Sequence, residues 1–134
     1  MDISNIKLMS FINLNKLNNH ILLLGPQNNI HEIMNVFDLH ILVSISEAFP
    51  NVLGEAMSVG TPCMSSNVGD AKEILDDFGK IININNNDDF IKGIEHFINI
   101  KRNIREWEKL RENCRSHIIK NYSIDGILIK YNKF

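Results

Sequence analysis

The sequence has little cysteine and no long apolar run. Its two cysteines, Cys63 and Cys114, have neither a paired nor a metal-binding spacing, so we expect two buried or half-buried thiols rather than a disulfide or a zinc site. No apolar run approaches the roughly 20 residues that cross a bilayer. The N-terminus has Asp2 and no basic region before an apolar block, which does not match a signal peptide. We therefore expect a cytoplasmic protein without a transmembrane segment.

A strong charge of either sign is also absent. The formal net charge is −2 with histidine neutral, which gives no electrostatic footprint for nucleic acid, and lipid binding is not indicated either. Hydrophobic residues make up 44% of the sequence and charged residues 22%, as in soluble globular proteins. The 134 residues suffice for one domain with a core and not for a two-domain enzyme. We expect a single domain over residues 1–134.

Metal-ligand patterns are missing as well. The five histidines have no ligand spacing, and the sequence after His31-Glu32 does not continue as the metalloprotease helix does. His40 lies inside an apolar stretch, where a core or sheet-edge histidine is expected. In residues 101–115 the basic side chains interleave with glutamates, which favours a solvated helix face over a membrane-surface patch.

The stretch that organises the chain begins at Asp38. Leu39–Val43 is an apolar run without turn residues, typical of a strand buried on both faces of a parallel sheet. A polar segment, Ser44–Asn51, follows it. Val52–Val59 then has helical periodicity and ends at Gly60-Thr61-Pro62, a usual stop signal. The predicted unit is strand, loop and helix.

The rest of the chain continues this alternation, which predicts an α/β fold, a Rossmann-like parallel sheet with flanking helices and a helical C-terminus. The expected helices are Ile3–Leu17, Ile30–Phe37, Ala71–Leu75, a helix from Asp89 onward, Asn103–Ile119 and Ile124–Tyr131, the last within a terminal helical segment at 120–134. The other expected strands are His20–Leu24, Cys63–Ser66 and Lys80–Asn83. The Asn/Asp-rich segment 83–89 is expected to cap the helix after it. Gly54 lies inside a predicted helix, where we expect it to permit close backbone packing.

The loop between the strand and the helix is the predicted ligand site. In open α/β sheets, ligands bind beyond the carboxyl ends of the strands, where helix N-termini attract anions such as phosphate. Glu47 and Glu55 flank this position. Carboxylates repel phosphate, so we expect them to accept hydrogen bonds from sugar hydroxyls. Two carboxylates also suit a glycosidase, which spacing alone does not exclude, although the helix entry between them favours a phosphate leaving group.

Residues Ser44–Pro62, which read S-x-S-E-A-F-P-N-V-L-G-E-A-M-S-V-G-T-P, resemble the donor-binding signature of family 4 (group 1) retaining glycosyltransferases. These enzymes have the GT-B fold of two facing Rossmann-like domains. The resemblance extends over about Asn5–Tyr131. The flanking segments that carry it are Leu22–Gly25, Asp38, Val68-Gly69-Asp70, Glu73-Ile74, Phe78–Ile82 and Asn121-Tyr122-Ser123.

The resemblance implies transfer of a sugar from a UDP- or GDP-sugar to an acceptor in glycan or polysaccharide biosynthesis, with retention and without a metal. It implies that Glu47 meets the donor sugar as the catalytic carboxylate and that Glu55 binds the ribose hydroxyls. Backbone N–H groups in residues 49–52 would bind the diphosphate, except at Pro50, which has none and shapes the turn. The substrate-binding set is then Ala48, Phe49, Pro50, Asn51, Val52 and Glu55. Ala48 stands where many members have glycine.

The site residues and the function each have alternative interpretations. Both glutamates could be solvated carboxylates, and residues 49–52 a simple helix entry. The family's nucleotide-binding domain opens with two further strand–helix steps, and a separate N-terminal domain supplies its acceptor site, so we expect an N-terminally truncated domain that is inactive alone. A non-catalytic fragment, half of a split enzyme that pairs with a separate N-terminal domain, or a nucleotide-sugar epimerase are the other hypotheses.

Overall fold

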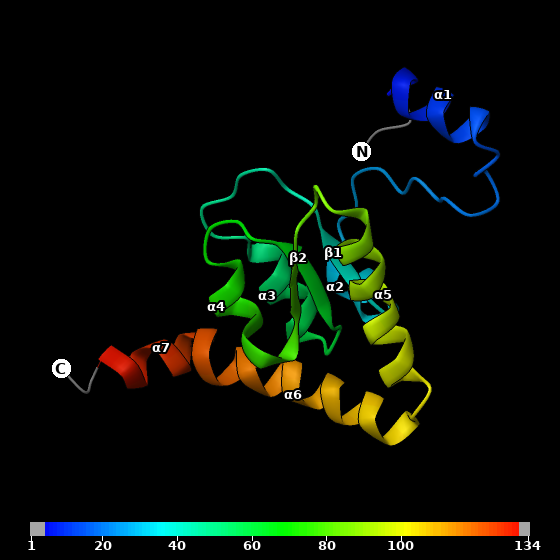
Figure 1. Cartoon of the computed structure of the whole chain (residues 1–134). Helices are drawn as coiled ribbons and strands as arrows, with labels where there is room; N and C mark the ends of the chain where they lie inside the picture. Colours follow the sequence, from blue (N-terminus) through cyan, green and yellow to red (C-terminus); the bar gives the residue numbers. More distant parts are fainter. Residues whose placement is uncertain (1–4, 132–134) are drawn as a thin grey trace. The chain divides into compact units, whose positions relative to one another are not determined.

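The computed structural model describes residues 5–131 and is shown in Figure 1. The chain divides into two compact units, Met1–Ile30 and His31–Phe134. The helices are α1 (Ile6–Leu14), α2 (Ile30–Asn35), α3 (Asn51–Ser58), α4 (Ala71–Leu75), α5 (Asn87–Lys101), α6 (Ile104–Tyr122) and α7 (Ile124–Tyr131), with a 3₁₀ turn at Asp76–Phe78. The strands are β1 (His40–Leu42), β2 (Cys63–Ser66) and β3 (Lys80–Ile82).

The first unit contains α1, which is shorter than the predicted helix. Asn5 caps it by accepting a hydrogen bond from the Leu8 N–H at 3.1 Å, and Ile12 is its buried residue. Ile3, where we expected the helix to begin, lies outside the described residues. The strand predicted at His20–Leu24 is wrong: this segment forms no sheet pairing, and the Leu22 side chain is 81% exposed. Apolar residues alone do not make a strand, because its backbone groups need a neighbouring strand to pair with.

The second unit is built on a parallel sheet in the order β1-β2-β3, with His40 opposite Cys63 and Met64 opposite Lys80. This confirms the predicted α/β class. β1 corrects one expectation, since its residues are only half-buried and Val43, just after it, is 53% exposed. β1 lies at an edge of the described sheet and pairs with β2 on one side, so no strand lies beside its other side to shield its side chains from solvent. His40 in β1 is half-buried, as expected, and burial lowers its pKa while the nearby Glu55 charge opposes that shift.

Helices cover both faces of the sheet. Successive side chains of β2 point to opposite faces, so their contacts show which helix lies on which face. The Cys63 thiol lies 3.8 Å from the Leu53 carbonyl oxygen in α3. The next residue, Met64, lies against Gly93 of α5, where an added Cβ would be 2.5 Å from the methionine sulfur. α3 and α5 therefore lie on opposite faces.

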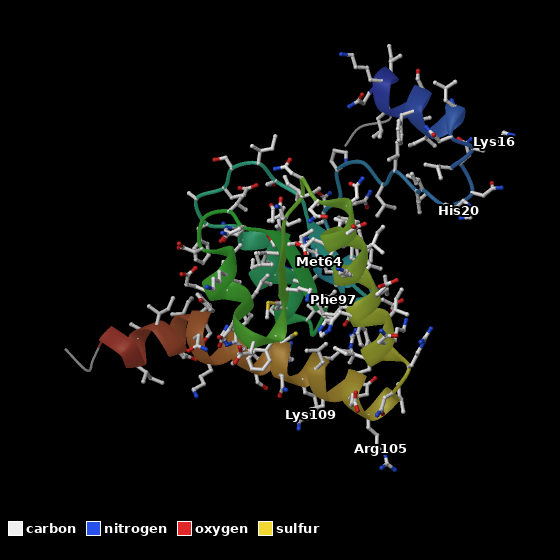
Figure 2. The ribbon with its side chains drawn as sticks, in the orientation of Figure 1. Lys16, His20, Met64, Phe97, Arg105 and Lys109 are labelled. Atoms are coloured by element: carbon white, nitrogen blue, oxygen red, sulfur yellow. The ribbon has the colours of Figure 1, made fainter. Side chains whose placement is uncertain are left out.

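The core on the α5 side consists of Met64, Ile82, Phe97 and Trp107. Figure 2 shows Met64 and Phe97 inside this unit, whereas Arg105 and Lys109 project outward from α6. The exposed basic residues agree with the predicted solvated face. α6 packs along α3 and α5 and leads into α7 (Figure 1).

The helix ends follow the predicted signals. Asn86 caps α5 by accepting hydrogen bonds from the Asp88 and Asp89 N–H groups, as the Asn-rich segment indicated. Gly60, just past α3, has φ +83°, a conformation that glycine adopts without a steric penalty. α6 runs to Tyr122, beyond the predicted end at Ile119, Ser123 separates it from α7, and α7 has the predicted bounds.

The two thiols are buried, as predicted. Burial raises the pKa of Cys63 well above its usual value and that of Cys114 to about 12, so both are protonated at neutral pH. Among the described residues, no helix combines the length and the apolar character needed to cross a bilayer.

Candidate functional site

The loop between β1 and α3 has the predicted place in the fold. It leaves the carboxyl end of β1 and enters α3 at Asn51, with Pro50 as the N-cap and no side-chain hydrogen bond at the cap. The Asn51 N–H donates to the Phe49 carbonyl at 2.9 Å, and the Leu53 N–H donates to the Pro50 carbonyl at 3.0 Å. The turn that the sequence assigned to phosphate binding is thus tightly folded, and Pro50 is buried within it.

Three contacts from the end of β2 and the segment after it hold this loop. The Ser66 hydroxyl donates to the Ser44 carbonyl at 2.6 Å, and the Asp70 N–H donates to the Ala48 carbonyl at 3.3 Å. Gly69 lies so close that an added Cβ would be 2.0 Å from the Ala48 carbonyl oxygen. The sequence drew attention to Val68-Gly69-Asp70 but gave no sign that these residues contact the loop, because contacts between loops depend on how the strands pair.

Glu47 is exposed, and the Ser44 hydroxyl donates a hydrogen bond to its Oε1 at 2.8 Å. Ser44 was not predicted as a partner of this carboxylate, although the short spacing of three residues between a hydroxyl donor and a carboxylate acceptor was visible in the sequence. The hydrogen bond fixes one oxygen of the carboxylate and leaves its other acceptor positions available.

Glu55 lies half-buried on α3 and lines a pocket of about 370 Å³ between α3, α4 and the end of α6. Other residues around this pocket are Phe49, Asn51, Gly54, Ser58, Ile74, Ile118, Tyr122 and Ile127. The structure therefore brings Phe49 and Asn51 together with Glu55. Glu47 is not among the residues that line this pocket.

A larger cavity, of about 550 Å³, lies at the carboxyl ends of the three strands. Ser44 follows β1, Ser66 ends β2, and Asn83 follows β3, and all three line it. This is the edge of a parallel sheet where ligands bind in open α/β folds. The cavity thus opens beside the start of the Glu47 loop, and its other lining residues are Ile45, Asn67, Val68, Ile81, Ile82, Ile84, Asn85 and Asp89.

Phe49 of the loop also contacts the C-terminal helices. Its ring centroid lies 6.2 Å from that of Tyr122 at the end of α6, and the Tyr122 hydroxyl donates to the Glu73 carbonyl at 3.1 Å. Burial raises the pKa of Tyr122, with the neighbouring carboxylates adding to the shift, so the phenol is neutral at physiological pH. The sequence did not reveal this contact, which joins residues far apart in the chain.

Comparison with known proteins decides the family. The model of the family described as "Glycosyl transferases group 1" matches residues 7–121. The chain belongs to the group 1 glycosyltransferases. A UDP-Gal:alpha-D-GlcNAc-diphosphoundecaprenol alpha-1,3-galactosyltransferase of Escherichia coli is 33% identical over 111 residues, which cover 81% of this chain and 27% of that protein.

Solved structures of glycosyltransferases have the same fold as this glycosyltransferase chain. A glycosyltransferase from Rickettsia africae superposes with a TM-score of 0.82 at 25% identity, over 95% of this chain and 34% of that one. HepE from Anabaena, solved in complex with UDP-glucose, gives a TM-score of 0.77 at 19% identity, over 95% and 35%. The chain therefore spans about a quarter to a third of each of these three proteins.

The surroundings of Gly54 contradict the expected close packing. No atom lies within 4 Å of where its Cβ would be, and the residue borders the pocket beside Glu55. The sequence-based expectation failed because a glycine inside a helix does not show which face is covered.

We expect Gly54→Ala to stabilise the chain by about 0.5–1 kcal/mol, because alanine lowers the backbone entropy lost in a helix and meets no obstacle here. Urea unfolding followed by circular dichroism measures this. Gly93→Ala is the matched control, since its Cβ would meet the Met64 sulfur, and we expect it to destabilise. An unfolding free energy that falls for Gly54→Ala would contradict the open space at this position.

Among residues 5–131, no group of three or more histidine, cysteine, aspartate or glutamate side chains is arranged to hold a metal ion.

Proposed function

We propose that this chain is the nucleotide-sugar-binding part of a retaining group 1 glycosyltransferase, which transfers a sugar from a nucleotide-diphosphate sugar to an acceptor. The observation that carries the proposal is the family match over residues 7–121, which contains the whole signature Ser44–Pro62. The placing of that signature at the carboxyl end of β1 supports it.

We propose residue roles that this geometry supports. We infer that the start of α3 faces the diphosphate, because the positive dipole end of a helix without a side-chain cap attracts an anion. The Asn51 and Leu53 N–H groups are bonded within the turn, so the donors to the diphosphate are other N–H groups of residues 49–52. Such preorganised donors also stabilise charge on the departing diphosphate without a metal. Glu47 then accepts hydrogen bonds from the donor sugar as the catalytic carboxylate, and Glu55 accepts them from the ribose.

The named ligands of similar proteins favour a UDP-sugar over a GDP-sugar. The relative from E. coli is named for transfer from UDP-Gal, and HepE was solved with UDP-glucose. We propose a UDP-hexose as the donor of this chain.

Catalysis by the isolated chain is a separate question. Because the chain covers 27% of its relative from E. coli, we propose that it binds the donor and needs a further polypeptide or domain, which supplies the acceptor site, for turnover. Where such a complex yields product, the anomeric proton coupling in its NMR spectrum tests retention. Conversion of the UDP-sugar to an isomer without any acceptor would instead support an epimerase.

Replacing Glu55 tests the binding role. We expect Glu55→Gln to weaken UDP binding by about tenfold, because the ribose hydroxyls lose a charged acceptor. Isothermal titration calorimetry with UDP measures the affinity. Glu108→Gln, a charge-neutralising change on the exposed face of α6, is the control and should leave UDP binding unchanged. Equal affinities of the parent and Glu55→Gln would contradict the proposed ribose contact.

A further inference from the structure

Two serines at the ends of neighbouring strands connect the sheet to the Glu47 carboxylate. Ser66 is the last residue of β2, only 3% exposed, and its hydroxyl donates to the Ser44 carbonyl at 2.6 Å. Ser44 comes soon after β1, and its own hydroxyl donates to Glu47 Oε1 at 2.8 Å. The carboxylate is thus linked through two hydrogen bonds to a buried residue of the sheet.

We propose that Ser44, held in place by Ser66, is a positioning residue that presets the Glu47 carboxylate for the hydroxyls of the donor sugar. The inference rests on the proposed function, in which Glu47 contacts that sugar. Glutamate has among the largest side-chain entropies to lose when it is ordered. A bond that already orders Glu47 in the free protein reduces this loss on binding, so the sugar binds more tightly.

The Ser44 hydroxyl is separable from the forces that hold the loop. Ser66 bonds the backbone carbonyl of Ser44, not its side chain. The Asp70 N–H and the close approach of Gly69 fix the backbone at Ala48. Removing the Ser44 hydroxyl therefore takes away the bond to Glu47 and leaves these backbone contacts in place.

The loop also offers a matched control. Ser46 lies two residues after Ser44 in the same loop, is exposed, and stands directly before Glu47. The hydroxyl that donates to Glu47 comes from Ser44 and not from Ser46. Ser46→Ala thus makes the same chemical change next to the same carboxylate without removing that bond.

The experiment compares the affinities of the full chain for UDP, UDP-glucose and UDP-galactose by isothermal titration calorimetry. We expect Ser44→Ala to weaken binding of the preferred UDP-sugar by about three- to tenfold, the cost of ordering one long side chain on binding, while UDP binding changes less than twofold. Ser44→Thr, which keeps the hydroxyl, should restore UDP-sugar binding. Ser46→Ala should match the parent, and Ser66→Ala should weaken UDP-sugar binding in the same direction as Ser44→Ala.

Other results would contradict either the positioning role alone or the proposed function as well. If Ser44→Ala weakens UDP and UDP-sugar equally, or behaves like Ser46→Ala, the positioning role is overturned while the proposed function stands. If Glu47→Gln leaves the ratio of UDP-sugar to UDP affinity unchanged, the sugar contact of Glu47 fails, and this inference fails with it. A parent chain that binds UDP but neither UDP-glucose nor UDP-galactose would also contradict the sugar contact of Glu47 and, with it, this inference. A parent chain that does not bind UDP overturns the proposed function itself.

Discussion

Replacing Gly69 with alanine is expected to lower the free energy of unfolding by about 2–4 kcal/mol, through backbone strain and a steric clash together. Gly69 has φ +46°, a conformation that residues with a Cβ rarely adopt. The new Cβ would lie 2.0 Å from the Ala48 carbonyl oxygen and 2.6 Å from that of Glu47. Both are backbone atoms and do not move aside by changing rotamer, so the Glu47 loop must shift as a whole.

The shift should also reach the proposed donor site. We expect Gly69→Ala to weaken UDP-sugar binding by about tenfold or more, since displacement of the loop moves Glu47 and the start of α3 together. Urea unfolding and calorimetric titration measure the two effects. For the unfolding measurement, Gly54→Ala is the control, because it is the same substitution at a position with open space. Gly69→Ala that is as stable as the parent and binds equally well would show that the loop does not depend on this close approach.

Replacing Trp107 with alanine should cost about 3–5 kcal/mol, the range for deleting a large aromatic side chain from a core. Trp107 is 5% exposed and belongs to the cluster with Met64, Ile82 and Phe97. The Lys101 ammonium lies 5.8 Å from its ring centroid and pairs with Asp38 at 2.5 Å. The substitution leaves a cavity where α5, α6 and the sheet meet.

Thermal and urea unfolding of Trp107→Ala test this expectation. Trp107→Phe keeps most of the apolar volume and should lose less than half as much stability. Ile104→Ala, at a position 64% exposed near the start of α6, should stay within about 0.5 kcal/mol of the parent. If Trp107→Ala and Ile104→Ala were equally mild, the cluster would not be the core that stabilises this unit.

Much of the fold was predictable because its signals are local. β2 and α4 have the predicted bounds, as has α7, since apolar periodicity and stop signals act within a few residues. The prediction failed at His20–Leu24 and overstated the burial of β1. Both errors concern pairing between strands, which a local pattern does not encode.

The candidate site was also predictable only in part. The signature indicated the family, which the family match confirms, and the loop, its helix and the two glutamates stay a predicted site. The partners of the loop were not predictable: Ser66, Gly69 and Tyr122 follow it in the chain by many residues and reach it only through the packing of the sheet and helices.

The amino-acid order by itself determined the alternation of helices and strands from β1 onward, the bounds of β2, α4 and α7 and the chemical identity of the signature, because these depend on side-chain type and short spacing. The tertiary structure decided which strand lies at an edge, which glycine is confined and which carboxylate has a hydrogen-bond donor. Gly54 and Gly69 illustrate the physical reason: they are the same residue, yet one faces open space and the other a backbone carbonyl 2.0 Å from its missing Cβ, a difference that arises only when distant segments pack together.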